Sequence, residues 1–407
     1  MKKQPIIAFL ILLLAIAGIA VYLRATTPSR PSGVRFPLSE SQRQLLESVP
    51  ASAEAFALVP TAAAVYGKLV ANPVTRDSVQ RWNEERGLPK PWMIGSGDLV
   101  VWRAGDQTSY AIQLDPVRSV LLRAWLPFGG AGMQIRSGVL LINGGEDAPF
   151  GPAGLKPFLD LAALLPAGDA LAVQLSGGRG SFPPLGRPAV SSVRIDAREI
   201  AVTSRAASTE APSSTSDGVR PRLPESALLS AWFAEPPRVL RDLDRLSLSR
   251  VSSLADEGGT IILYDVNAGT LLPRPKGVLI VPATAGAVEA ANRLKAVAEA
   301  VGEIQESGGN IQLAFDRSSM AVYAGESFAD FPWPATEWAI RADVQRLLPV
   351  LHKLGDSTGL RLAAPRIHRA ARDLRRWIDL LEPARTIDAG LSRTGRIEEL
   401  RVRVTSK

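Results

Sequence analysis

The feature that most constrains this chain is an unbroken apolar run near its N-terminus, residues Ile6–Leu23. Lys2 and Lys3 precede the run, and Arg24 follows it. An α-helix of this length is about 27 Å long at about 1.5 Å per residue, which is enough to cross a thin bilayer. The sequence therefore predicts an N-terminal transmembrane helix, residues 1–24, that anchors a large water-soluble body to a membrane.

A cleaved signal peptide is the alternative interpretation of the same run. The leading lysines resemble the positive n-region of a signal peptide, and Ala15–Ala17 and Gly18–Ala20 resemble small-residue cleavage sites. Against cleavage, the apolar run continues to Leu23 and exceeds the roughly 7–15 residues usual for a signal peptide. We therefore expect an uncleaved signal-anchor.

The charges around the run and the cysteine content bear on where the body lies. Lysines lead the run, but Arg24, Arg30 and Arg35 follow it, so the positive-inside rule is nearly balanced. The chain has no cysteine, so nothing can mispair in an oxidising compartment. We expect a single-pass protein of the cytoplasmic (inner) membrane of a bacterial envelope, with its body facing the periplasm or the exterior.

The net charge of +7 comes mainly from arginine and is spread along the chain. No block of basic residues lies beside aromatic residues, so no nucleic-acid partner is expected. An exported basic chain meets anionic headgroups and wall polymers instead. The predicted partners are the membrane, through Ile6–Leu23, and an envelope protein, an anionic lipid or a wall polymer.

Two segments rich in Ser, Thr, Pro and Gly divide the chain, because such a composition cannot bury a core. They predict linkers over residues 25–39 and 207–222. The two predicted α+β domains are then residues 40–206 and 223–407. We also expect the body to fold when residues 1–35 are removed.

The two predicted domains share one order of elements, β-α-β-β-α-β-β. This order contains the ferredoxin-like βαββαβ pattern with one strand added. In the second domain, the second helix is expected over 286–306 and the next pair of strands over 310–315 and 320–323. The predicted fold class is α+β: an N-terminal transmembrane helix, then two similar halves of ferredoxin-like order with extra strands. The second half adds two helices, over 344–355 and 365–381.

Two motifs resemble those of enzymes, but the residues around each of them exclude a catalytic or metal-binding role. Residues 355–359 fit the letters G-x-S-x-G, but they follow a helix instead of a strand, and no acid lies between Ser357 and His368. The two histidines, His352 and His368, do not form a metal-binding His-Glu-x-x-His pair. The sequence therefore predicts no catalytic residue, no metal site and no cofactor.

Adjacent carboxylates are equally weak candidates for acid–base chemistry. Glu398 and Glu399 fall on a predicted strand, where neighbouring side chains point to opposite faces. The two groups therefore cannot share one site.

The densest positive charge lies between Arg361 and Arg376. An apolar stripe that includes Ile367, Leu374 and Leu381 predicts an amphipathic helix with a basic outer face. One interpretation is a solvated face; the other is a contact for anionic headgroups, wall polymer or an acidic partner. The predicted anionic-surface contacts are Arg366, Arg369, Arg372, Arg375 and Arg376.

These observations favour a non-enzymatic function. We expect a membrane-anchored envelope protein that binds a partner or helps to organise an assembly. The alternative is a hydrolase or a ligand-binding protein with its site in the cleft between the two halves, a common place for pockets.

Overall fold

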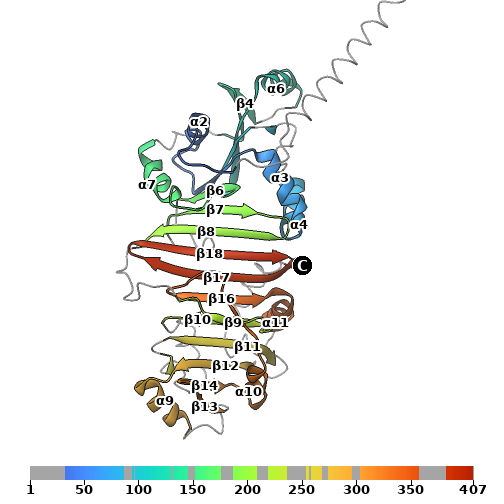
Figure 1. Cartoon of the computed structure of the whole chain (residues 1–407). Coiled ribbons are helices and arrows are strands. Elements are labelled where there is room, and N and C mark those ends of the chain that lie inside the picture. The colour runs from blue at the N-terminus through green and yellow to red at the C-terminus, as the bar shows by residue number, and fades with distance from the viewer. Residues whose placement is uncertain are drawn as a thin grey trace, which may run out of the picture. The chain divides into compact units, whose positions relative to one another are not determined.

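The computed structural model of the chain describes most of the sequence after residue 32 (Figure 1). The described residues are 33–86, 94–95, 97–129, 132–144, 152–175, 187–208, 219–235, 254–255, 258–267, 274–295, 303–356 and 382–406. None of the helices within them has both the length and the apolar content needed to cross a membrane. The predicted transmembrane helix, residues 1–24, lies outside the described residues.

The chain divides into two compact units, the first ending at Ala207 and the second beginning at Ser208. The first unit holds eight strands in the order β8-β7-β6-β1-β2-β3-β5-β4, and each strand is antiparallel to its neighbours within the unit. The strands are β1 (Ala55–Val59), β2 (Leu99–Ala104), β3 (Gln107–Gln113), β4 (Met133–Arg136), β5 (Val139–Ile142), β6 (Ala170–Gln174), β7 (Ala189–Ile195) and β8 (Glu199–Ala207).

The second unit holds eight strands of the large sheet in the order β18-β17-β16-β10-β11-β12-β14-β13, again antiparallel. They are β10 (Leu229–Phe233), β11 (Gly259–Asn267), β12 (Arg274–Pro282), β13 (Ile304–Ser307), β14 (Asn310–Ala314), β16 (Trp338–Asp343), β17 (Ala384–Thr394) and β18 (Ile397–Ser406). A separate two-stranded sheet pairs β9 (Arg222–Pro224) with β15 (Phe328–Asp330).

The two units have the same strand order. If the strands of each large sheet are taken in chain sequence, the first lies between the second and the sixth in both units. The third strand then pairs with the fifth, and the fourth ends the order. One topological plan therefore describes both units.

Eight helices are described in the two units. They are α2 (Glu40–Leu46), α3 (Ala62–Ala71), α4 (Pro73–Arg86), α6 (Pro116–Gly129), α7 (Pro152–Ala162), α9 (Ala285–Lys295), α10 (Arg317–Ala324) and α11 (Val344–Asp356). In the first unit, α2 and α7 lie on one side of the sheet, and α3, α4 and α6 lie on the other (Figure 1). Alternation along the strands supplies an apolar face to each side, since Val100 faces one core cluster and Val101 the other.

The predicted fold class is wrong, because antiparallel sheet dominates the described chain and its order is not ferredoxin-like. In the ferredoxin-like pattern another strand separates the two that flank the first helix, whereas here β1 pairs directly with β2. The sequence predicts one helix between them, but the structure has two, α3 and α4. A single crossover helix would bring the next strand back parallel to β1. The second helix reverses the chain direction once more, so β2 runs antiparallel to β1.

A second correction concerns residues 304–324. The helix expected over 286–306 ends at Lys295 as far as it is described, and Ile304–Ser307 is strand β13. Gly308 and Gly309, both with positive φ, form the turn from β13 to β14. The strand expected over 320–323 is instead part of helix α10, because Asp316 caps its N-terminus by accepting the Ser318 N–H at 2.9 Å.

Candidate functional site

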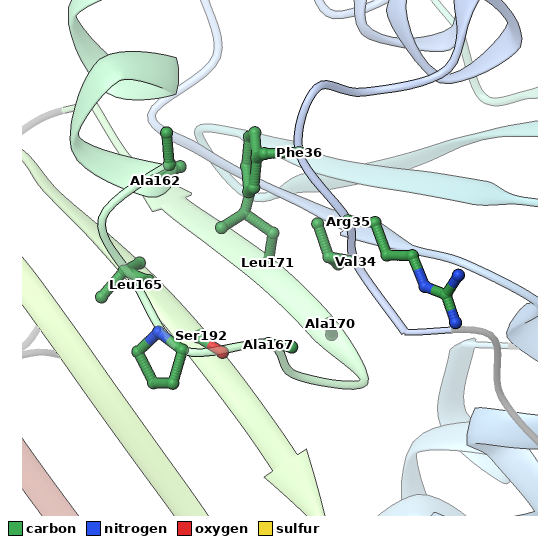
Figure 2. Close-up of a pocket in the computed structure, with 11 residues that line it drawn as sticks. Val34, Arg35, Phe36, Ala162, Leu165, Ala167, Ala170, Leu171 and Ser192 are labelled. Atoms are coloured by element: carbon green, nitrogen blue, oxygen red, sulfur yellow. The ribbon is translucent and has the colours of Figure 1, made fainter.

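A pocket of about 370 Å³ opens in the first unit between the segment after Gly33, the end of α7 and strands β6 and β7 (Figure 2). Its volume is at the low end of the range for small-molecule sites. The lining residues are Val34, Arg35, Phe36, Ala162, Ala163, Leu165, Pro166, Ala167, Ala170, Leu171 and Ser192.

The wall is built around the loop that joins α7 to β6. Val34 donates its N–H to the carbonyl oxygen of Gly168 at 2.8 Å and is itself a buried core residue, 5% exposed. Gly168 is required there, because a Cβ at this position would lie 2.3 Å from the Ser192 hydroxyl oxygen. The segment from Val34 to Phe36 is thereby fastened to the sheet.

The lining is mainly apolar, with one cation. Arg35 is the single ionisable residue among the lining side chains, and it is exposed. Figure 2 shows it across the pocket from Ala162 and Leu165, with Leu171 between. The arrangement can accept an apolar chain along the wall and an anionic group at the arginine.

A second group of chemically notable residues lies in the second unit, on strands β16, β17 and β18. The carboxylate of Asp388 accepts a hydrogen bond from Arg341 Nε at 2.8 Å and one from Arg403 Nε at 3.1 Å. The three residues are direct cross-strand neighbours, and Asp388 is only 2% exposed. The two arginines together neutralise the buried negative charge of Asp388.

Aromatic rings cover these three residues, Arg341, Asp388 and Arg403, which we call the ion ladder. The Arg341 guanidinium lies 5.9 Å from the Phe331 ring centroid, and the Arg403 guanidinium lies 5.9 Å from that of Trp333. The two rings meet edge to face at 5.1 Å. Gly390 makes room for the cover, since a Cβ there would lie 2.7 Å from Trp333 Nε1. The Asp388 carboxylate is therefore enclosed in packed structure, whereas Arg403 stays partly exposed, and the ladder acts as a cross-strand brace.

The adjacent carboxylates Glu398 and Glu399, which were weak candidates for acid–base chemistry, pair with different arginines. Glu398 accepts a hydrogen bond from Arg393 at 3.0 Å, and Glu399 forms an ion pair with Arg401. Among the described residues, no group of three or more His, Cys, Asp or Glu side chains could hold a metal ion.

The residues predicted to contact an anionic surface, Arg366, Arg369, Arg372, Arg375 and Arg376, lie outside the described residues. Ser357 and His368 lie outside them too, and His352 is half-buried on α11. The basic surface therefore stays a prediction from sequence.

Neither the pocket nor the ion ladder was predicted from the sequence. Residues 34–36 were assigned to a linker, and no local pattern connects them with Ser192. The ladder left no distinctive signal, because β17 and β18 carry further charged residues, among them Arg385, Glu399 and Arg401, that do not belong to it. Neither the comparison with known protein families nor the comparison with curated proteins finds a match to this chain.

Proposed function

We propose that this chain is a membrane-anchored envelope protein that binds a single-chain anionic amphiphile in the pocket of its first unit. Residues Ile6–Leu23 form the anchor, in a single pass of the cytoplasmic membrane, and the body lies on the outer side. The role is binding without chemical transformation. The observation that carries it is the composition of the pocket, an apolar wall with a single cation at one side.

The apolar wall supplies the affinity. Phe36, Leu165 and Leu171 are the large side chains that a hydrocarbon chain would contact. Each methylene group removed from water contributes about 0.8 kcal/mol, but ordering the ligand opposes this gain. For decanoate, with a dozen non-hydrogen atoms at about −0.4 kcal/mol each, the dissociation constant is about 0.1–1 mM.

Arg35 supplies the preference for an anion. Its side chain is exposed, so an ion pair with a carboxylate contributes at most about 1 kcal/mol and weakens with salt. We therefore expect decanoate to bind more tightly than decanol by up to about fivefold at low salt.

The test is calorimetric titration of the chain with decanoate below its micelle concentration. Ala167 is an exposed lining residue, so Ala167→Trp fills the pocket from its rim and should abolish binding. The matched control is Ala51→Trp, at an exposed alanine outside the lining, which should bind as the wild type does. Arg35→Gln should remove the preference for decanoate over decanol. Equal binding by the Ala167→Trp variant, or no heat at millimolar decanoate, would refute the pocket as the site.

A further inference from the structure

Helix α6 of the first unit is apolar on both of its long faces. It begins after Asp115, whose carboxylate accepts the N–H of Arg118 at 3.0 Å, with Pro116 in the first helical position. The inner face packs on the sheet, where Leu122 is buried against Ile112 and Leu140. The Arg118 side chain on this face is fully buried and pairs with Asp115.

The outer face exposes large apolar side chains. Val120 is 67% exposed and Trp125 is 40% exposed, and Pro116, Ala124 and Pro127 are exposed beside them. The helix contains no acidic residue, and Arg123 is its exposed charge. A helix that carries large apolar side chains on its outer face as well as its inner face is normally covered by protein or by lipid.

Helix α9 of the second unit provides an internal comparison. It occupies the same place in the topology as α6, between the third and fourth strands of its sheet. After Ala285 and Gly286 in the first turn, its exposed positions are polar: Asn292 and Lys295 face solvent, and Glu289 pairs with Arg293. The shared topology therefore does not require an apolar outer face at this position, and the face of α6 needs an explanation of its own.

We propose that the outer face of α6 docks on the headgroup region of an anionic lipid bilayer. Tryptophan is favoured at that depth because its ring is apolar and its N–H is polar. Arg123, the exposed charge of the helix, attracts anionic headgroups. Such a helix lies in the plane of the interface with its apolar side about 5–10 Å deep.

This inference rests on the proposed N-terminal anchor, which keeps the bilayer within reach. Val34, the first buried residue, follows Leu23 by eleven positions, and a fully extended chain of that length spans at most about 40 Å. The tether raises the effective concentration of the lipid surface, so a weak contact by α6 suffices.

The absence of cysteine from the chain allows the contact to be read at single positions. Val120→Cys and, as the matched control on α9, Asn292→Cys each carry an environment-sensitive nitrobenzoxadiazole label. The full chain is reconstituted in vesicles of phosphatidylcholine and phosphatidylglycerol, with and without nitroxide-labelled lipid. We expect the emission of the label at position 120 to shift to shorter wavelength and to be quenched by the nitroxide, and the label at 292 to show neither change.

The outcomes separate the two proposals. Failure of the full chain to float with the vesicles would overturn the anchor. Flotation with a label at position 120 that remains water-exposed would overturn the docking of α6 while leaving the anchor in place. Equal quenching at positions 120 and 292 would also overturn it, because the contact would then not be specific to the apolar face. Weaker quenching at position 120 in phosphatidylcholine alone, or at high salt, would support the role of Arg123.

Discussion

Replacement of Asp388 by alanine should destabilise the second unit strongly. The change leaves two guanidinium groups facing each other across β17 without the carboxylate that both contact. Loss of one partner from a fully buried pair costs about 3–5 kcal/mol. Arg403 is 31% exposed, so water recovers part of its solvation, and we expect a loss of about 2–4 kcal/mol in the free energy of unfolding.

The matched control is Asp330→Ala in the same unit. Asp330 lies 3.6 Å from Arg222 in an ion pair whose two side chains are both exposed. Such a pair contributes little, so the change should stay within about 0.5 kcal/mol. Urea unfolding read by hydrogen exchange of peptides from β16, β17 and β18 reports on the second unit alone. A loss below about 1 kcal/mol for Asp388→Ala would refute the view that the ladder is a buried brace.

Three further changes test other parts of the structure. Gly67→Ala should raise the free energy of unfolding by about 0.5–1 kcal/mol in thermal melts, because the site is inside α3 and a Cβ there meets nothing within 4 Å. Burial raises the pKa of Asp316, but hydrogen bonds from Ser318 and Ser319 outweigh it and hold the pKa below its usual value. Its contribution to stability is therefore present above about pH 4 and lost as the pH falls through the lowered pKa, and acid titration of Asp316→Asn should show a smaller loss in that window. A chain that begins at residue 33 should have a free energy of unfolding about 1.5–3 kcal/mol larger than a chain that begins at residue 36, because only the longer chain buries Val34. Thermal melts compare the two chains. Decanoate should bind to the longer chain alone.

Much of the strand content could be predicted from sequence because apolar runs were bounded by clear turn residues. The apolar runs over 132–136 and 139–142 predict two short strands, and the structure has β4 and β5 there, joined through Gly138 with positive φ. The prediction of a strand over 320–323 was wrong because two local signals conflict there. The Val322–Tyr323 stretch has strand propensity, but the cap at Asp316 starts a helix before it.

The order of the strands could not be derived from the pattern, because it depends on how many helices lie between neighbours. Asn72 separates α3 from α4 by one residue, and Pro73 begins the second helix, so the two appeared as one segment. The pocket was hidden for a related reason: Val34 and Ser192 meet through the fold of the loop at Gly168, and nothing in their local sequence indicates it.

The proposed topology, in which the N-terminal run holds the body on the outer side of a cytoplasmic membrane, can be tested in cells. The most direct measurement is a pair of C-terminal fusions in a bacterial host, one to a phosphatase that is active only outside the cytoplasm and one to a fluorescent protein that matures only inside it. Deletion of residues 1–24 serves as the control that should reverse the pattern. We predict an active phosphatase and a dark fluorescent fusion for the full chain, both in the membrane fraction. A bright fluorescent fusion with an inactive phosphatase would refute this topology and place the body inside the cell.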